Sequence, residues 1–295
     1  MLNDRLRIEI WRNVTAALAE DVGGGDITAL LIPAQSHAQA VIVTREAAVV
    51  CGTDWFDAAF AALSPEAVVN WRVRDGDVVS PGQTLCEVSA PARALLTAER
   101  TALNFLQLLS ATATATRRYV DAIAGTRARI VDTRKTLPGL RLAQKYAVAV
   151  GGGLNHRHGL YDGILIKENH IIAAGGVDKA LKAAQALRKH DAFVEIEVET
   201  LGELRAALEA GAGMILLDNM GLDEMREAVR IADGRATLEA SGGITLENVR
   251  AAAETGVDRI SIGSLTKDVK ALDLSLRLAS GGNAPSPTAW NRSAN

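Results

Sequence analysis

Cysteine and aromatic side chains are scarce in this chain of 295 residues. Cys51 and Cys86 have neither the spacing of a metal site nor the density of a disulfide scaffold, which favours a reducing, cytoplasmic location. The aromatic residues are four Trp, three Tyr and four Phe, and the isoelectric point lies near 6.0. Because stacking platforms are few and no general basic field exists, we expect no nucleic-acid partner.

Long apolar runs are also absent. No stretch approaches the roughly 20 residues that cross a bilayer, so we expect no membrane association. Near the start, apolar residues recur at every fourth position from Leu2 to Leu18, which predicts an amphipathic helix over 1–20 rather than a signal peptide. With 48% hydrophobic residues, the chain can bury a large core, as one α/β domain or as a barrel with a smaller domain.

The first part of the chain is typical of a small α+β domain. Short β-rich runs at 38–50 and 67–88 are followed by a long helical stretch from near Pro91 towards Gly125. We therefore predict an N-terminal domain over residues 1–110. An alternative interpretation is that the protein is a carrier or binding module. It is suggested by residues 75–83, which have the turn-and-strand pattern of lipoyl and biotinyl carrier domains. Those domains present a modified lysine, whereas no lysine precedes position 135.

Beyond Gly125, strand-like runs alternate with helical segments. The runs are 129–132, 163–166, 193–198, 214–217, 237–240 and 259–262. Continuous apolar runs in a βα rhythm indicate parallel strands buried on both faces, in a barrel or in a doubly wound sheet. We favour the barrel, because polar residues at the strand ends would then converge on one mouth. These residues are Asp132, Lys167, Glu197, Asp218, Ser241 and Ser261.

Positive charge is concentrated between Arg127 and Lys167. Eight basic residues lie there against two acidic ones, although the whole chain has a net charge of −3. Guanidinium groups form two-pronged hydrogen bonds with carboxylates and phosphates, and a bound anion relieves their mutual repulsion. The cluster predicts a small, multiply charged anion as ligand.

Two glycine-containing turns and two acids are further candidates. Ser241-Gly242-Gly243 and Ser261-Ile262-Gly263 follow the last two strands, where barrels commonly bind phosphate at a helix N-terminus, although either turn alone could be an ordinary connection. Glu197 and Asp218 could share a divalent cation or bind sugar hydroxyls. Asp218 closes an apolar run, and burying an unpaired charge is costly, so we expect it to be functional.

Glu197 and a group of three histidines each allow a second interpretation. Glu197 alternates with Glu195 and Glu199, a set that could face solvent instead. His156, His158 and His170 fall within fifteen residues, which raises the possibility of a metal site. The spacing lacks a zinc pattern and the surroundings are cationic, so a histidine that donates to an anion, beside structural ones, is the better interpretation.

Motifs in order along the chain resemble those of quinolinate phosphoribosyltransferases. They are Glu99–Asn104, Asp132–Thr136, Asn155–Arg157, Asp162–His170 and Leu217–Asn219. The similarity extends from Glu20 near the start to Ser275 near the end. One departure is Lys267, where the family often has histidine; a cation is retained there.

The resemblance implies an α/β fold and an activity. An incomplete, seven-stranded TIM-like barrel over 111–270 would follow an α+β open-sandwich domain over 1–110, which residues 271–285 would assist, and 281–295 would form a flexible tail. The reaction would transfer phosphoribose from phosphoribosyl pyrophosphate (PRPP) to quinolinate, releasing pyrophosphate and CO2 and giving nicotinate mononucleotide for NAD biosynthesis. Mg²⁺ would accompany PRPP, without an organic cofactor. The alternatives are a related transferase acting on another aromatic acid, and a non-catalytic barrel that senses phosphorylated metabolites.

The resemblance also implies roles for individual residues. The quinolinate carboxylates would be held by Arg134, His156, Arg157 and Lys167, with Arg100 from a neighbouring subunit. Thr133 would support its loop. The catalytic set would be Lys135, Lys167, Glu197 and Asp218, with both lysines towards the pyrophosphate and both acids at ribose hydroxyls or Mg²⁺, directly or through water. The 5′-phosphate would bind Ser241, Gly242, Gly243, Ser261, Ile262 and Gly263. Sites shared in this way imply a homodimer or a larger assembly.

Overall fold

The chain forms two compact units. The computed structural model describes residues 4–187 and 192–279, so the expected tail over 281–295 lies outside it. One unit contains the chain up to Thr114, Leu142–Gly151 and the described residues from Val269; the other contains Ala115–Arg141 and Gly152–Asp268. Among the described residues, we find no helix with both the length and the hydropathy needed to cross a membrane.

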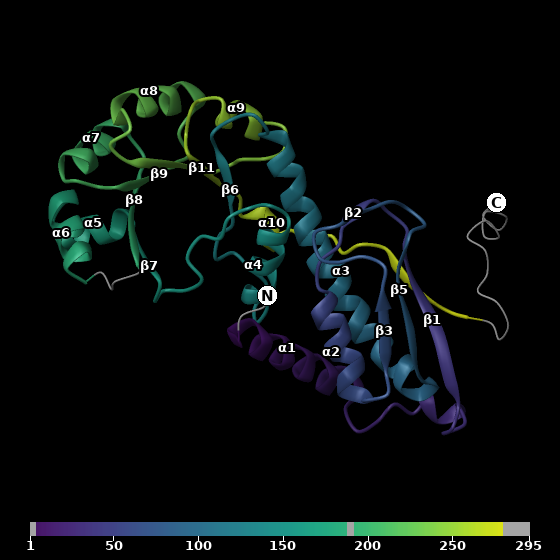
Figure 1. The fold of residues 1–295 in the computed structure, drawn as a ribbon. Coiled ribbons are helices and arrows are strands. Elements are labelled where there is room, and N and C mark those ends of the chain that lie inside the picture. The colour runs from purple at the N-terminus through teal and green to yellow at the C-terminus, as the bar shows by residue number, and fades with distance from the viewer. Residues whose placement is uncertain (1–3, 188–191, 280–295) are drawn as a thin grey trace. The chain divides into compact units, whose positions relative to one another are not determined.

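The first unit is an antiparallel sheet with helices. Its elements are α1 (Asp4–Val22), a 3-10 turn (Ala29–Leu31), β1 (His37–Thr44), β2 (Ala48–Val49), α2 (Thr53–Leu63), β3 (Val68–Trp71), β4 (Val78–Val79), β5 (Thr84–Pro91), the first part of α3 (Ala92–Ala122), and β12 (Leu274–Leu278). The main sheet has the order β12-β1-β5-β3, and β2 pairs with β4. Figure 1 shows α2 and α3 beside this sheet.

Aromatic side chains on α2 form much of the core of this unit. Trp55, Phe56 and Phe60 are almost fully buried, and the Phe56 ring lies 5.2 Å from that of Trp71 on β3. Strand β12 returns from the far end of the chain and pairs with β1, with Leu276 opposite Ile42. The predicted helices at the start of the chain and after Pro91 are present as α1 and α3.

The second unit is a parallel sheet with helices outside it. Its elements are β6 (Arg129–Val131), β7 (Gly163–Ile166), α5 (Glu168–Ala174), α6 (Val177–Leu187), β8 (Phe193–Val198), α7 (Leu201–Glu209), β9 (Met214–Asp218), α8 (Leu222–Ala232), β10 (Thr237–Ser241), α9 (Val249–Ala253), β11 (Arg259–Ser261) and α10 (Ser264–Lys267). Helix α4 (Arg141–Val150) follows β6, and from Leu142 it groups with the first unit. The strands coincide with the apolar runs expected from the sequence.

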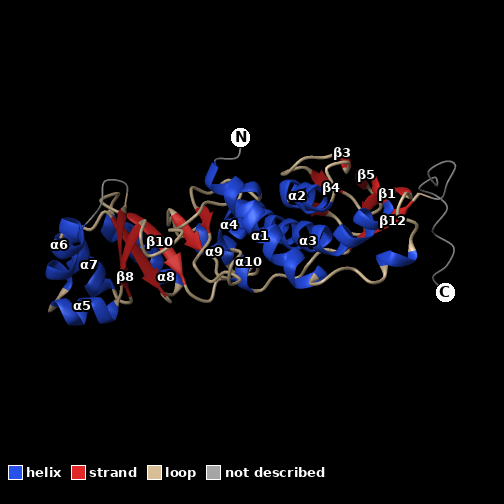
Figure 2. Ribbon diagram, turned by 90° about the horizontal axis from the view of Figure 1, so that it is seen from below, coloured by secondary structure: helices blue, strands red, loops and turns tan. Residues whose placement is uncertain are grey.

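The parallel sheet curves but does not close. Its order is β6-β11-β10-β9-β8-β7, so among the described residues β6 and β7 are its two edges. Figure 1 shows the strands along an arc with α7, α8 and α9 on its outer side, and Figure 2 shows α5, α6 and α7 beyond β8. The described sheet has six strands where seven were expected, and Leu154 adds a single parallel bridge to Val131 on the β6 edge.

The strand register gathers the polar strand ends at one edge of the sheet. Asp218 at the end of β9 pairs with Ser241 at the end of β10, and Glu197 on β8 lies opposite Leu216 on β9. On the other side, Ser261 on β11 pairs with Val131 on β6. Because all these strands are parallel, their carboxyl ends open towards the same side.

Candidate active site

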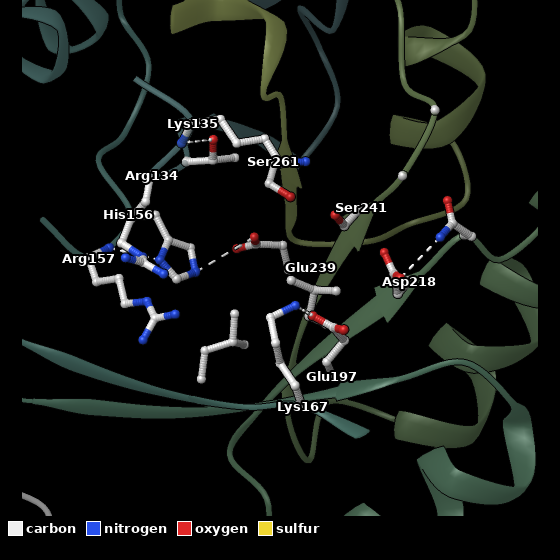
Figure 3. A pocket seen from close by; sticks show the side chains of 16 residues that line it. Arg134, Lys135, His156, Arg157, Lys167, Glu197, Asp218, Glu239, Ser241 and Ser261 are labelled. Atoms are coloured by element: carbon white, nitrogen blue, oxygen red, sulfur yellow. Dashed lines mark hydrogen bonds and ion pairs between the residues drawn. The ribbon is translucent and has the colours of Figure 1, made fainter. Parts of the chain in front are cut away.

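A cavity of about 610 Å³ lies at the carboxyl ends of the parallel strands. Figure 3 shows the side chains around it. The lining residues are Thr133, Arg134, Lys135, His156, Arg157, Leu165, Lys167, Glu197, Leu216, Asp218, Asn219, Glu239, Ser241, Gly242, Gly243 and Ser261. Of the expected site residues, only Arg100, Ile262 and Gly263 do not line this cavity. Ile262 is buried, and Arg100 belongs to the first unit.

Arg134 and Arg157 form the cationic side of the cavity (Figure 3). Arg157 is 9% exposed, and its Nη1 donates to the carbonyl oxygen of Gly163 at 3.1 Å. Burial lowers the pKa of Arg157, and the nearby positive charge of Arg134 lowers it further. Two cations held close together in a partly buried wall favour the binding of an anion between them.

Hydrogen bonds hold the loop that follows β6 and join it to the loop that contains Asn155 and His156. The fully buried carboxylate of Asp132 accepts from Asn155 Nδ2 at 2.7 Å and from the backbone N–H of His156 at 2.8 Å. The Thr133 hydroxyl accepts from the backbone N–H of Lys135 at 3.0 Å. These bonds fix the backbone that presents the cationic side chains.

His156 lies at the cavity, but its ring nitrogens are engaged with protein groups. Nδ1 accepts from the backbone N–H of Arg157 at 2.8 Å, and Nε2 lies 2.7 Å from Glu195 Oε2. The expectation that His156 donates to a bound anion therefore needs the Glu195 contact to break. His158 and His170 have structural contacts, with Asp162 at 3.3 Å and with the backbone N–H of Lys167 at 3.0 Å.

Glu195 and Glu239 form a buried acidic pair that the sequence interpretation missed. Both are fully buried, so the solvent-facing alternative for the alternating glutamates is wrong for Glu195, whereas Glu199 is exposed. Desolvation raises the pKa of each to about 7, and the charge of Glu195 adds to the effect on Glu239. Arg259 Nε lies 2.9 Å from Glu239 Oε2 and offsets part of the negative charge.

This pair makes stability depend on pH. We expect the free energy of unfolding to fall as pH rises from about 4.5 to about 7, because the folded protein keeps protons that the unfolded carboxyls have already released. Glu239→Gln should remove part of this decrease in the free energy of unfolding, on the order of 2–3 kcal/mol between pH 4.5 and pH 7. Urea denaturation at a series of pH values measures it, and parallel curves for wild type and variant would contradict the assignment.

Acids at the ends of β8 and β9 form the opposite side of the cavity. Lys167 Nζ lies 2.5 Å from Glu197 Oε2. Burial raises the pKa of Asp218, and the negative charge of Glu197 raises it further, with Lys167 and Lys135 acting in the opposite direction. Two carboxylates that repel each other at a cavity wall suit a cation or a set of hydroxyl donors. Their oxygen donor set fits Mg²⁺.

The glycines of the two turns have different roles. Gly242 has φ +96°, and a Cβ there would lie 2.0 Å from Asn219 Oδ1, so only glycine fits. A Cβ on Gly263 would lie 3.1 Å from Lys135 Cδ, so this glycine makes room for the Lys135 side chain. The helix expected directly after Gly243 begins later, because α9 starts at Val249. A turn lies between them. In this turn the Asn248 side chain accepts from the backbone N–H of Thr245 and donates to the carbonyl oxygen of Gly243.

Leu165, Leu216 and Asn219 are further lining residues for which the sequence analysis gave no separate role. Leu165 and Leu216 stand on β7 and β9 and supply apolar surface between the charged groups. Asn219 follows Asp218 with φ 56°, and its backbone N–H donates to the carbonyl of Ser241 at 2.9 Å. A flat aromatic anion with polar substituents would fit a cavity of this composition.

Comparison with protein families agrees with this arrangement. The model of the N-terminal domain of quinolinate phosphoribosyl transferase matches residues 26–110, and the model of the C-terminal domain matches residues 112–277. The chain belongs to the quinolinate phosphoribosyltransferase family. The boundary between the two family domains falls within α3.

Individual members of the family are similar over nearly their whole length. The nicotinate-nucleotide pyrophosphorylase [carboxylating] of Mycobacterium leprae is 46% identical, over 90% of this chain and 95% of that protein. The probable enzyme of the same name from Bacillus subtilis is 43% identical, over 87% of this chain and 89% of that one. The structure of the nicotinate-nucleotide pyrophosphorylase from Francisella tularensis has a TM-score of 0.89 at 45% identity, covering 92% of this chain and 96% of that one.

Proposed function

We propose that the protein transfers the phosphoribosyl group of PRPP to the ring nitrogen of quinolinate, with loss of pyrophosphate and CO2, and so forms nicotinate mononucleotide. The observation that carries this proposal is the cavity itself. Arg134 and Arg157 line one side of it and Glu197 and Asp218 the other, in a chain of the quinolinate phosphoribosyltransferase family. Such a cavity suits a dicarboxylate next to a phosphorylated sugar.

The quinolinate end of the cavity is assigned to its cationic side. Quinolinate carries two adjacent carboxylates, and Arg134 and Arg157 offer planar, two-pronged donors for them. Lys167 would bind the remaining carboxylate oxygens once it leaves its ion pair with Glu197. Leu165 and Leu216 would contact the aromatic ring.

The PRPP end is assigned to the acidic strand ends and the serine-containing turns. Ser241, Gly242, Gly243 and Ser261 would bind the 5′-phosphate, and Lys135 would face the pyrophosphate. Glu197 and Asp218 would bind ribose hydroxyls or hold Mg²⁺, directly or through water. When bound, Mg²⁺ supplies positive charge that neutralises the departing pyrophosphate.

The chemistry needs positioning and charge stabilisation more than covalent catalysis. As pyrophosphate leaves, the ribose carbon gains positive charge, which Glu197 and Asp218 stabilise while Lys135 and Lys167 stabilise the leaving group. The pyridine nitrogen then attacks that carbon. The alkylated nitrogen is an electron sink next to the 2-carboxylate, so the carbon–carboxylate bond breaks and CO2 leaves without help from an organic cofactor. The electron pair left on that ring carbon then takes a proton from water, which gives nicotinate mononucleotide.

One experiment separates this function from its alternatives. The protein is incubated with Mg²⁺, PRPP and quinolinate labelled at the 2-carboxylate, with nicotinate as the control substrate. Labelled CO2 from quinolinate and no nucleotide from nicotinate would support the proposal. Nucleotide formation only with another aromatic acid would indicate a related transferase, and binding without turnover would indicate a sensor of phosphorylated metabolites.

We also propose a cytoplasmic enzyme that works as a homodimer or larger assembly with shared sites. The proposal of shared sites rests on Arg100, which lies on α3. The family resemblance assigns this residue to the quinolinate carboxylates in the site of a neighbouring subunit. In a symmetric pair, each chain would then complete the site of the other.

Mixing two inactive variants is expected to restore activity if sites are shared. In a heterodimer of Arg100→Ala and Arg157→Ala chains, one site carries both defects and the other carries neither. Random exchange of subunits should therefore recover up to about a quarter of wild-type turnover per chain, since half of the dimers would be mixed. Turnover is measured after exchange under mild denaturant. A homodimer of each variant is the control, and no recovery from proven heterodimers would place Arg100 outside the partner's site.

A further inference from the structure

One face of β8 carries three side chains that contact Lys167 or His156 at the cavity. Phe193, Glu195 and Glu197 occupy alternate positions, so they point to the same face of the strand. Glu197 pairs with Lys167, whereas the other two contact His156. The Phe193 ring packs edge-on against the imidazole at 5.1 Å, and Glu195 Oε2 lies 2.7 Å from its Nε2.

The hydrogen bonds of the imidazole define its protonation. Nδ1 accepts from the backbone N–H of Arg157, so it carries a lone pair rather than a proton. The proton of the neutral ring is then on Nε2, which donates to Glu195. A continuous chain of hydrogen bonds therefore extends from the β8 carboxylate through the ring to the backbone of Arg157.

A metal site at this position is disfavoured by the same bonds. His156, Glu195 and Glu239 offer ligand atoms within 4.8 Å of one another, which resembles a metal-binding triad. A metal would need the lone pair of Nε2, but that nitrogen holds the ring proton while Nδ1 accepts from Arg157. Arg259, at 2.9 Å from Glu239, already supplies positive charge.

The position of Arg157 depends on close packing at this point. Its guanidinium donates to the Gly163 carbonyl, and a Cβ on Gly163 would lie 2.8 Å from the Phe193 ring and 3.2 Å from Arg157 Cβ. The Arg157 side chain therefore starts from the backbone in a space that Gly163 and the Phe193 ring restrict. Because the Arg157 backbone N–H donates to the His156 ring, a rotated ring would lose this bond and with it a restraint on the backbone from which the guanidinium extends.

We propose that Glu195 is a positioning residue for quinolinate recognition, and that it acts through His156 to hold Arg157 at the cavity. The inference rests on the proposed function, because it assigns the positioned guanidinium to a quinolinate carboxylate. Glu195 itself touches no substrate in this assignment. Burial of its carboxylate, which costs solvation free energy, is then explained by the orientation that it imposes on the ring.

Two substitutions distinguish the effect of losing the hydrogen-bond acceptor at position 195 from the effect of changing the volume of the side chain. Glu195→Leu keeps a similar volume without an acceptor, whereas Glu195→Gln keeps an oxygen that can accept from Nε2. We expect Glu195→Leu to raise KM for quinolinate about 10- to 100-fold and to leave KM for PRPP within about twofold. Glu195→Gln should restore most of the quinolinate affinity. Glu199→Leu, at an exposed position just beyond β8, is the matched control.

A double-mutant cycle tests whether the effect passes through the histidine. His156→Phe removes both ring hydrogen bonds, so adding Glu195→Leu to it should change KM for quinolinate by less than about twofold. Equal losses for both substrates together with a lower melting temperature, or additive effects in the cycle, would overturn the proposal. If Glu195→Leu precipitated, Glu195→Ala would carry the same measurement. A wild-type protein that does not turn over quinolinate would instead refute the proposed function.

Discussion

Replacing Arg157 by alanine is expected to weaken quinolinate binding by ~2–5 kcal/mol, which corresponds to a loss of roughly 30- to several-thousand-fold in affinity. The guanidinium is nearly buried, and burial and the charge of Arg134 both lower its pKa, so the free site already bears the cost of holding two cations together. A bound dicarboxylate offsets that cost, and removing the arginine leaves a carboxylate desolvated and unpaired. Calorimetric titration with quinolinate measures the loss.

The same titration with matched variants gives the control. Arg134→Ala should behave like Arg157→Ala, while PRPP binding should change little in either. Arg157→Lys should recover only part of the affinity, because an ammonium group cannot form the two-pronged contact. Arg129→Ala removes an exposed arginine at the start of β6, away from the cavity, and should bind quinolinate like wild type. Unchanged affinity in both Arg134→Ala and Arg157→Ala would disprove the carboxylate clamp.

The parallel strands and the line of polar residues at their ends could be predicted from the sequence because both are local patterns. Each apolar run in the second half became a strand, and Lys167, Glu197, Asp218 and Ser241 lie at or next to strand ends at the cavity. Neighbouring parallel strands start and end together, so a polar residue at the end of each run is brought to the same edge. The cavity follows from that rule without knowledge of any side-chain contact.

The buried acidic pair could not be predicted in the same way. Glu195 and Glu239 stand on β8 and β10, which are separated in the sheet by β9. Even so, carboxyl oxygens of the two residues lie within 4.8 Å of each other, so their charges interact. One signal was present in the sequence: Glu239 alternates with Ser241 and Glu195 with Glu197, and residues two apart in a strand share a face. The partner of Glu195, His156, comes from a loop, whose position no periodicity specifies.

Replacing Asp218 by asparagine is expected to lower kcat about 100-fold or more while the fold stays intact. Removing one preorganised charged group from the transition state of an enzyme commonly costs this much. The substitution keeps the size of the side chain and removes only its charge at the end of β9. Because burial and the charge of Glu197 raise the pKa of Asp218, the ionised carboxylate is disfavoured in the folded state. The variant should therefore melt no lower than wild type at pH 8.

The measurement is kcat at saturating Mg²⁺, PRPP and quinolinate, together with the melting temperature. Asp223→Asn is the matched control, because Asp223 lies in the first turn of α8, five residues further along, and its side chain is 99% exposed. It should retain wild-type turnover. A loss of turnover in Asp218→Asn with unchanged KM values would mean that the carboxylate acts on the developing charge of the ribose rather than on ground-state binding. Wild-type turnover in Asp218→Asn would remove this residue from the mechanism and leave Glu197 as the acid that faces the ribose.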